Sequence, residues 1–484
     1  MNFASLTFLH LFLPCVLAAV FAVPKGWRDT VLLAASLFFF AWGAPKFLLP
    51  LVAGCLFDHL LVRGYRRGGT PADDRRNNWL CGIGVAANVL ALGWFKYAGF
   101  AVEQANALLA ALGFGAALPA VRVALPLGIS FFTFQKISYL VDVRRGAAAP
   151  APTFRRYLLY ITLFPQLAMG PIIRYRDLAG QFGERSVASE DFLQGLWRFA
   201  LGLARKTLLA GPLAGLSAAA FGATDGGALL SAPSAWLGLY AYTLQIHFDF
   251  AGYCDMAVGI GRMLGFRFPE NFDAPYIARD MAEFWRRWHI TLGAFLREYL
   301  YIPLGGNRCS RARSLLNNWI VFLVSGIWHG AAWNFVAWGA WHGLWIVFAK
   351  IFRRGGAKDD RRRAADIPSA LWTFLMAMLG WVFFASAGFG GVALFFRSLA
   401  GCGGAGATAL PPPSPQAVAA LAAGTALSFL PAVFPCLGLA EWRLSPRAPA
   451  AATWARTAAT ALLLLLATLP LPVSGFTPFI YNRF

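Results

Sequence analysis

Residues 315–349 read LLNNWIVFLVSGIWHGAAWNFVAWGAWHGLWIVFA, and two apolar runs meet there close to His329. The stretches Leu315–Ala331 and Ala332–Phe352 each approach the roughly 20 apolar residues that a helix needs to cross a hydrocarbon core. An ionisable side chain at membrane depth is costly, and such residues are functional candidates by default. The segment therefore predicts two membrane helices and a candidate functional histidine.

The apolar pattern extends along the whole chain. Of its 484 residues, 58% are hydrophobic and 13% are charged, whereas about a quarter of the residues in soluble domains are charged. These values exclude a soluble globular protein, and we expect an all-α polytopic membrane protein with about ten to twelve transmembrane helices in a single domain, residues 1–484. The other apolar stretches of suitable length are Ala4–Val23, Phe47–Val62, Asn78–Phe100, Ser369–Phe384, Ala417–Leu437 and Thr457–Pro472.

The net charge of +20 fits the basic loops that orient membrane proteins better than it fits nucleic-acid binding. The basic clusters Arg63–Arg76 and Lys350–Arg363 directly follow apolar segments, so we place both in the cytoplasm. Lys25 and Arg28 follow the first apolar segment and no charge precedes it, which predicts an N-terminus outside the cytoplasm. The seven cysteines show no paired spacing, so neither a metal site nor a disulfide framework is expected.

The region Asn271–Arg313 is polar, aromatic and basic, and it contains no complete membrane span. Large apolar residues recur in it at helical spacing, which predicts an amphipathic helix that lies on the membrane or enters it as a re-entrant segment. These residues are Phe284, Trp288, Leu292 and Phe295. The following sequence IPLGGNR predicts a turn, in which Gly305 and Gly306 permit unusual backbone angles.

Two of the six histidines stand in contexts that suggest chemistry. Gly326 and Gly330 lie close to His329, and small neighbours permit tight helix packing or leave space for a ligand. Burial favours the neutral imidazole, which can act as a general base. A histidine that only ties helices together through its ring nitrogens is the alternative, and the residues alone leave both open. His289 lies in the stretch WRRWHITL, and we expect it to meet the helix of His329.

The other histidines favour structural roles. His10 and His59 lie near the ends of apolar stretches, where interfacial histidines are common. His247 lies in an unusually polar span, and a structural hydrogen bond is slightly favoured there over chemistry. His342 follows His329 by 13 residues, which places it on a nearly opposite face if one helix continues. We therefore expect it to pack or to support the site.

Two long motifs resemble the membrane-bound O-acyltransferase family. The first is ENFDAPYIARDMAEFWRRWHITLGAFLREYLYIPLGGNR, residues 270–308, and the second is GIWHGAAWNFVAWGAWHG, residues 326–343. They look most like the branch of bacterial alginate O-acetylases, with its relatives for peptidoglycan, cellulose and teichoic-acid D-alanylation. Further stretches similar to that branch, such as LPLGISFFTFQKISYLVDVRRG and DFAGYCDMAVGIGRMLGF, extend the resemblance over nearly the whole chain.

The resemblance implies a ring of helices with a central catalytic pore, with a family-like core at about residues 125–352 and C-terminal helices at residues 369–484. It implies an enzyme that moves an acetyl group from a cytoplasmic thioester, expected to be acetyl-CoA, across the bacterial inner membrane. The group would serve O-acetylation of an exported polysaccharide, with alginate as the first expectation and peptidoglycan or cellulose as the alternative. No tightly bound cofactor and no metal are implied.

The resemblance also assigns roles to single residues. The histidine of the WHG motif, His329, is implied as catalytic, and His289 matches a second functional position upstream. Arg286, Arg287 and Arg308 are candidates to meet the phosphates of the donor, although membrane topology alone also explains arginines there. The remaining candidates for binding donor or substrate are Trp285, Trp288 and Asp255.

Tyr481 is a candidate acyl relay if the C-terminal tail folds back into the pore, and simple anchoring of the tail is the alternative. Besides the lipid bilayer, the implied partners are a periplasmic protein of the SGNH hydrolase-like type and a polysaccharide export and modification complex. A transporter or flippase is the alternative of another class, because many helices and polar residues within the membrane fit it. The sequence lacks the paired broken segments that transporters often show. A scaffold for an export complex is a third alternative.

Overall fold

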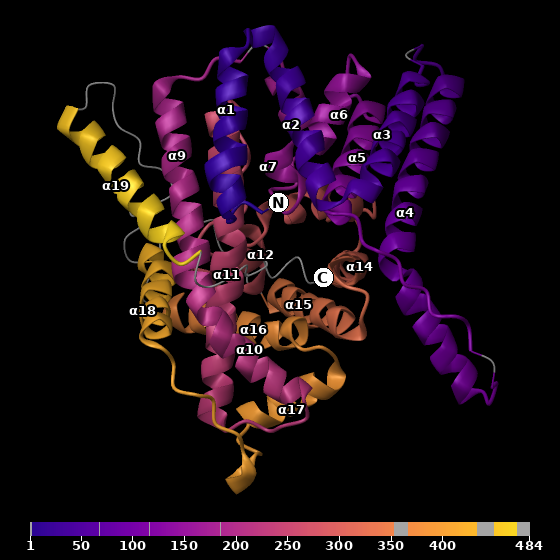
Figure 1. Cartoon of the computed structure of the whole chain (residues 1–484). Helices are drawn as coiled ribbons and strands as arrows, with labels where there is room; N and C mark the ends of the chain where they lie inside the picture. The colour runs from indigo at the N-terminus through magenta and orange to yellow at the C-terminus, as the bar shows by residue number, and fades with distance from the viewer. Residues whose placement is uncertain are drawn as a thin grey trace. The chain divides into compact units, whose positions relative to one another are not determined.

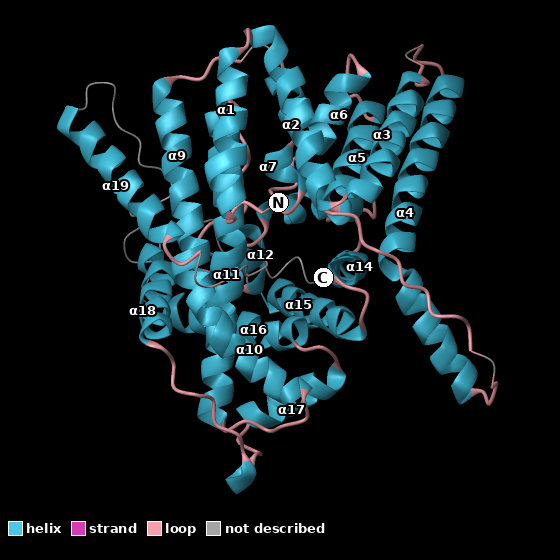
Figure 2. Ribbon diagram, viewed as in Figure 1, coloured by secondary structure: helices cyan, strands magenta, loops and turns pink. Residues whose placement is uncertain are grey.

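The computed structural model describes residues 2–66, 68–115, 117–183, 185–352, 366–432 and 450–471. Within these ranges the regular secondary structure is helical, and extended segments pair only in two isolated bridges (Figures 1 and 2). The expected all-α fold is thus confirmed. The chain forms two compact units: residues 1–195 with 260–269, and residues 196–259 with 270–484. The ring, its pore and the single domain stay predictions.

Unit 1, residues 1–195 with 260–269, consists mainly of helices from the first part of the chain (Figure 1). Helix α2 packs against α1 and α6, and α4 packs against both α3 and α5. The helices are α1 (Leu13–Ala22), α2 (Arg28–Gly43), α3 (Leu48–Arg63), α4 (Pro71–Ala111), α5 (Ile129–Arg144), α6 (Phe154–Thr162), α7 (Phe164–Leu167), α8 (Tyr175–Leu178) and the start of α9 (Ser189–Ala204).

A buried pair of charges lies among the helices of unit 1. The ammonium group of Lys136 on α5 lies 3.3 Å from the carboxylate of Asp58 on α3. Asn88 on α4 and Tyr157 on α6 donate hydrogen bonds to the same carboxylate, at 2.9 and 3.1 Å. Because an unpaired charge in a dry interior is very costly, this network favours one arrangement of the four helices.

Unit 2, residues 196–259 with 270–484, contains both of the long histidine motifs. Helix α9 continues through a π-helical turn, Arg205–Ala210, into α10. The helices of this unit, besides the end of α9, are α10 (Gly211–Asp225), α11 (Ala232–Met263), α12 (Met281–Arg287), α13 (Ile290–Leu296), α14 (Arg311–His329), α15 (Trp333–Phe352), α16 (Ile367–Ala385), α17 (Phe389–Leu399), α18 (Pro415–Phe429) and α19 (Ala450–Thr468).

Helices α14 and α15 form a hairpin that depends on glycine at its line of contact. A Cβ atom at Gly326 would overlap the carbonyl oxygen of Phe335, and a Cβ atom at Gly339 would overlap that of Phe322. Backbones approach this closely only where small residues face each other. The hairpin therefore fixes the end of α14, where His329 is the last helical residue.

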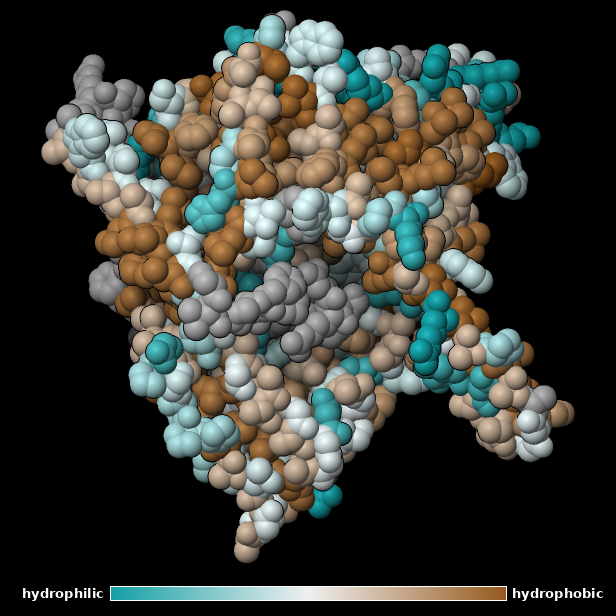
Figure 3. Space-filling model, in the orientation of Figure 1, coloured by the Kyte–Doolittle hydropathy of each residue, from teal (hydrophilic) through white to brown (hydrophobic). Residues whose placement is uncertain are grey.

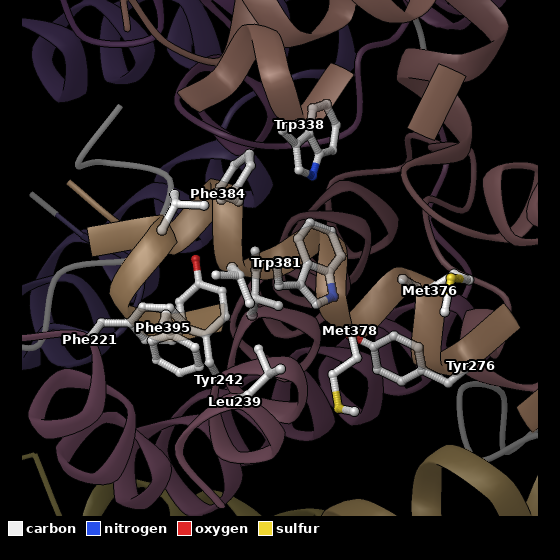
Figure 4. Packing of buried hydrophobic residues seen from close by; sticks show 14 of the residues in the cluster. Phe221, Leu239, Tyr242, Tyr276, Trp338, Met376, Met378, Trp381, Phe384 and Phe395 are labelled. Atoms are coloured by element: carbon white, nitrogen blue, oxygen red, sulfur yellow. The ribbon is translucent and has the colours of Figure 1, made fainter. Parts of the chain in front are cut away.

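An aromatic cluster forms the interior of unit 2 (Figure 4). The ring of Trp381 on α16 lies 6.3 Å from the ring of Trp338 on α15 and 4.9 Å from that of Trp288, between centroids. Phe384 packs edge-on against Trp338 and Trp381, at 5.5 and 5.8 Å. Aromatic pairs of this kind contribute about 0.5–1.5 kcal/mol each beyond their burial. The cluster thus holds α15 and α16 against the segment that carries Trp288.

The prediction of a single amphipathic helix within Asn271–Arg313 is wrong at the centre of this region. The helix breaks at His289, whose backbone is left-handed with φ of 46°, so α12 and α13 are separate. The four stripe residues are buried as expected, but they lie on two short helices and the link between them. The predicted turn is confirmed, with φ of 108° at Gly305 and 54° at Gly306.

A second break bears on the placement of His342. Helix α14 ends at His329 and α15 begins at Trp333, so the continuous helix assumed for an opposite face does not exist. His342 instead lies within α15, and its ring packs 4.8 Å from that of Trp338. The same indole ring lies 4.8 Å from His329, so the two histidines share a neighbour.

Six helices within the described ranges are long and apolar enough to cross a membrane. They are Pro45–Arg63, Pro71–Ala111, Ser189–Asp225, Trp333–Phe352, Ile367–Ala385 and Ala451–Thr468, and five of them overlap predicted spans. The predicted span Ala4–Val23 corresponds to a shorter apolar helix, Phe8–Ala22. Helix α14, expected to span, begins at Arg311 and also contains Arg313, and it is not among the six. The total of ten to twelve helices stays a prediction.

Large apolar side chains remain exposed on α2, α3 and α4 of unit 1, and Figure 3 shows hydrophobic surface over this unit. Examples are Phe38, Trp42, Leu49, Leu60 and Leu90. Soluble proteins rarely expose large apolar patches to water, whereas lipid tails cover such patches in a bilayer. The surface of these helices is therefore suited to contact with lipid.

Candidate active site

His289 lies in the two-residue link between α12 and α13, outside the six candidate membrane spans. A bridge between Phe272 and Trp288 pairs this link with the segment before α12. The amide of Ile290 donates a hydrogen bond to the backbone oxygen of Asn271 at 3.0 Å. These backbone contacts hold His289 in its left-handed conformation, which a residue with a side chain rarely adopts.

The side chain of Asn271 contacts the His289 ring directly. Its Oδ1 atom lies 3.2 Å from Nδ1 of His289. The same oxygen accepts hydrogen bonds from the backbone amide and the hydroxyl of Thr291, at 3.1 and 2.9 Å. Its amide nitrogen donates to the sulfur of Cys254 at 3.1 Å. One buried asparagine therefore connects the His289 ring to the first turn of α13 and to α11.

Burial determines the charge state of His289. Its side chain is 1% exposed, and the rings of Phe250 and Trp328 lie 4.8 and 6.3 Å away between centroids. Burial lowers the pKa of His289 to about 3, because an imidazolium ion loses its hydration in such surroundings. The ring is therefore neutral at physiological pH and can accept a proton only when a reaction supplies one.

His329 lies at the C-terminal end of α14 and is 4% exposed. The rings of Trp328 and Trp338 each lie 4.8 Å from its ring, and that of Phe384 lies 5.2 Å away, all nearly perpendicular to it. Figure 4 shows Trp338 and Phe384 close to each other at this edge of the aromatic cluster. This aromatic wall fixes the ring and keeps bulk water from it.

The structure brings the two predicted histidines to one place. Trp328 contacts both rings, because its centroid lies 4.8 Å from that of His329 and 6.3 Å from that of His289. The residues come from two segments that are 40 positions apart in the sequence. The expectation that the segment of His289 meets the helix of His329 is therefore confirmed.

A cavity of about 660 Å³ lies within unit 2, and its lining includes residues near both histidines in the chain, although neither histidine lines it. It reaches Ile290, which directly follows His289, and Ser325, which lies one helical turn before His329. Its walls combine apolar side chains with a few polar groups. The lining residues are Ala282, Trp285, Arg286, Ile290, Leu292, Gly293, Ala294, Leu296, Arg297, Tyr301, Asn307, Asn318, Val321, Phe322, Ser325, Ile346, Ala349 and Lys350.

Three cationic side chains line the cavity, and no carboxylate lies among the residues that line it. They are Arg286 on α12, Arg297 just after α13, and Lys350 near the end of α15. The ammonium group of Lys350 donates to the hydroxyls of Tyr301 and Ser314, at 3.1 and 2.6 Å. A concave site with several cations and apolar walls is suited to a ligand that carries both phosphate and apolar parts.

The sequence candidates differ in their relation to this cavity. Trp285 and Arg286 line it, whereas Trp288 packs in the aromatic cluster and Arg308 is exposed in the turn after α13. Asp255 is buried on α11 and forms ion pairs with two arginines. These are Arg198, at 2.7 Å, and Arg205. Its carboxylate thus ties together helices of unit 2, away from the lining of the cavity. Tyr481 lies outside the described residues.

The sequence analysis missed Arg297, Lys350 and Asn271. Arg297 and Lys350 are 53 positions apart, and the fold alone places them in one cavity. Asn271 lies at the border of the quoted motif, 18 positions before His289, where no regular spacing relates the two.

Comparison with known proteins finds similarity to membrane-bound acyltransferases. The model of the membrane-bound O-acyltransferase family matches residues 119–388. The probable alginate O-acetylase AlgI of Azotobacter vinelandii is 40% identical over 385 residues, which cover 79% of this chain and 75% of that protein. The protein of the same name from Pseudomonas putida is 35% identical over 501 residues and covers both chains completely. The peptidoglycan O-acetyltransferase of Helicobacter pylori is 36% identical over 391 residues, which cover 75% of this chain and 71% of that protein.

Proposed function

The chain belongs to the membrane-bound O-acyltransferase family and is an O-acyltransferase with several membrane helices, and we propose from this premise that it transfers acetyl groups for the O-acetylation of an exported polysaccharide. Acetyl-CoA on the cytoplasmic side is the donor, and the protein lies in the bacterial inner membrane. The cavity that reaches Ile290 and Ser325, with three cations and no lining carboxylate, is the observation that supports this most strongly. The transporter and scaffold alternatives are not retained.

The proposed chemistry uses His329 as the general base. Its neutral imidazole takes the proton of an acceptor hydroxyl while the hydroxyl oxygen attacks the carbonyl carbon of the thioester. The new C–O bond forms, the C–S bond breaks, and the leaving thiolate takes the proton back from the imidazolium. The aromatic wall of Trp328, Trp338 and Phe384 keeps water away from the base, which limits hydrolysis of the thioester.

The proposed donor fits the cavity by size and charge. A phosphate-bearing thioester meets Arg286, Arg297 and Lys350, while its apolar arm lies along Leu292 and Phe322. Both arginines are exposed and line the cavity, which makes them accessible to phosphate. No cofactor beyond the donor is required by this scheme, because the thioester itself supplies the activated acyl group.

Alginate is the proposed polysaccharide, because the AlgI relatives include one that matches the whole chain. Peptidoglycan is the second candidate, which the relative at 36% identity favours. The final acceptor is reached through a periplasmic SGNH-like partner within an export and modification complex. Tyr481 is the proposed relay to it, and a Tyr481→Phe variant with normal acetylation would exclude this role.

The activity is tested with purified full-length protein in liposomes and acetyl-CoA that is radiolabelled in the acetyl group. Wild type should release free CoA and transfer label to an acceptor, whereas His329→Ala should abolish transfer at an unchanged protein level. Full activity of His329→Ala would refute the role of the base. Acetyl content of alginate and of peptidoglycan in cells with and without the gene, measured by NMR, identifies the polymer.

The donor site is tested by comparing three arginine variants. Arg286→Ala and Arg297→Ala should raise the KM for acetyl-CoA by about tenfold or more, because a charge-assisted hydrogen bond contributes about 1.5–3 kcal/mol. Arg308→Ala is the matched control, because Arg308 is exposed like Arg286 and Arg297 but lies outside the lining of the cavity. An equal rise in KM for all three variants would contradict the assignment of this cavity.

A further inference from the structure

The orientation of the Asn271 side-chain amide follows from its neighbours. The backbone amide of Thr291 can only donate a hydrogen bond, and it lies 3.1 Å from the Asn271 atom that also faces His289. That atom must therefore be the carbonyl oxygen, Oδ1. The amide nitrogen then points to the sulfur of Cys254 at 3.1 Å, an acceptor, which agrees with this orientation.

This orientation decides which ring nitrogen of His289 carries the proton. A carbonyl oxygen accepts hydrogen bonds only, so Nδ1 of His289, 3.2 Å from Asn271 Oδ1, must be the N–H. A neutral imidazole carries one ring proton, so Nε2 carries the lone pair. Nε2 is buried and has no hydrogen-bond partner among the described residues. A buried acceptor without a partner is costly, so Nε2 is a ready contact for an incoming donor.

The geometry points to Asn271 as the positioning residue that fixes His289 in the Nδ1–H tautomer, so that Nε2 accepts a hydrogen bond from an O–H or N–H group of the acyl acceptor other than the attacking hydroxyl, whose one proton goes to His329. The inference rests on the proposed acyl transfer, and it makes Nε2 of His289 a hydrogen-bond acceptor and not a donor. A ring whose Nε2 is an acceptor cannot donate to the developing oxyanion. The oxyanion must therefore find its donors elsewhere, and His289 helps to orient the acyl acceptor.

The backbone supports the same assignment. Asn271 accepts the amide hydrogen of Ile290 through its own carbonyl oxygen at 3.0 Å, and its side chain accepts the next amide, that of Thr291. These two bonds fix the backbone of the residues that directly follow His289 and hold Asn271 Oδ1 at the position where it faces the ring. The groups that face His289 are the rings of Phe250 and Trp328 and the amide of Asn271, none of which carries a charge.

The tautomer is tested without any assay of activity. Full-length protein with ¹⁵N-labelled histidine is studied by NMR in detergent micelles, and the His289 signals are identified by their loss in His289→Gln. Wild type should show a protonated Nδ1 and an unprotonated Nε2. A proton on Nε2 would overturn the proposal even if the enzyme proves to be an acetyltransferase.

Two variants of Asn271 separate a positioning role from a purely structural one. Asn271→Leu removes the acceptor, and kcat should fall by about ten- to a hundredfold, as expected when a partner that orients a histidine is lost. The KM for acetyl-CoA should stay within about twofold. Asn271→Asp keeps the acceptor and should restore most of kcat. Its carboxylate should also stabilise the imidazolium, so the acidic limb of the pH–rate profile should move to higher pH.

Thr291→Val serves as the control for local stability. It removes one hydrogen bond to the same Oδ1 atom and leaves the contact with His289 in place. If Thr291→Val lowers kcat as much as Asn271→Leu does, the asparagine acts through the fold of α13 alone and the proposal fails. A normal kcat in Asn271→Leu would overturn it as well. If even wild type lacks acetyl transfer while NMR shows the expected tautomer, the proposed function fails and the tautomer assignment stands.

Discussion

The substitution Glu283→Gln should destabilise the segment that carries Trp285 and Arg286. The Glu283 carboxylate accepts hydrogen bonds from the backbone amide and the Nε of Arg279 and from the Nε of Arg287, each at 3.0 Å. Its side chain is 6% exposed, whereas those of the two arginines are 29% and 24% exposed. One nearly buried carboxylate thus bonds both to Arg279, just before α12, and to Arg287, the last residue of α12.

The expected loss follows from these three bonds. Each is charge-assisted, and such bonds contribute about 1.5–3 kcal/mol when the group is buried. Glutamine keeps one carbonyl oxygen as an acceptor, but its NH₂ group then faces the donors of one arginine. Because water screens the partly exposed arginines, we expect a net loss of about 2–3 kcal/mol in the free energy of unfolding.

The loss of stability in Glu283→Gln should depend on pH, and the pKa of Glu283 gives the direction of this dependence. Burial acts to raise the pKa of Glu283, but hydrogen bonds from Arg279 and the charges of both arginines outweigh it and lower this pKa below its ordinary value of 4.5. Such a carboxyl stabilises the fold above the pKa of the unfolded state, and the contribution is lost as pH falls through the folded value. The difference between wild type and Glu283→Gln should therefore be full at pH 7 and shrink below about pH 4.5.

The assay is denaturant or thermal unfolding in detergent across this pH range. Asp273→Asn is the matched control, because Asp273 pairs with the same Arg287 at 2.8 Å but its side chain is 69% exposed. An exposed pair of this kind contributes about 0–1 kcal/mol. Equal stability of Glu283→Gln and wild type at pH 7, or a difference that grows in acid, would refute the reasoning.

Three further substitutions test other parts of the structure. Lys350→Met removes a cation from the cavity and its bonds to Tyr301 and Ser314, and the KM for acetyl-CoA should rise about tenfold in a steady-state assay. Gly339→Val places a side chain against the carbonyl oxygen of Phe322, so size-exclusion chromatography should show aggregated protein. Gly390→Ala is the control and should elute normally, because a Cβ atom at Gly390 meets no atom within 4 Å. Asp58→Asn leaves the buried Lys136 without its carboxylate and should cost about 3–5 kcal/mol in detergent unfolding. The double variant Asp58→Asn with Lys136→Met should recover most of that loss; no recovery would argue against the ion pair.

Local patterns were sufficient to predict much of the fold. Stretches such as Phe47–Val62 and Ser369–Phe384 are apolar over the length of a membrane span, and each coincides with an observed helix. Hydrophobicity over 16 to 20 residues is a property of the segment itself, so no distant contact is needed to read it. The same holds for the turn at Gly305 and Gly306, where the side chain that glycine lacks permits the observed φ values.

The break at His289 shows where such patterns fail. Phe284, Trp288 and Leu292 recur at helical spacing, and the burial they predict is correct, yet the helix stops between them. The left-handed residue is stabilised by Asn271, whose contacts reach across the chain to Ile290 and Thr291. Periodicity reports which side chains avoid water, but it does not report a competing hydrogen-bond partner 18 positions away.

By itself, then, the sequence determined that this is a helical membrane protein and which two histidines to consider, because hydrophobic length and an ionisable residue in an apolar run are local properties. Only the tertiary structure decided that Arg286, Arg297 and Lys350 share one cavity, that the carboxylate of Asp255 is paired elsewhere, and that the ring of His289 faces Asn271. These are contacts between segments far apart in the chain. Their geometry depends on how the helices pack, which no single segment encodes.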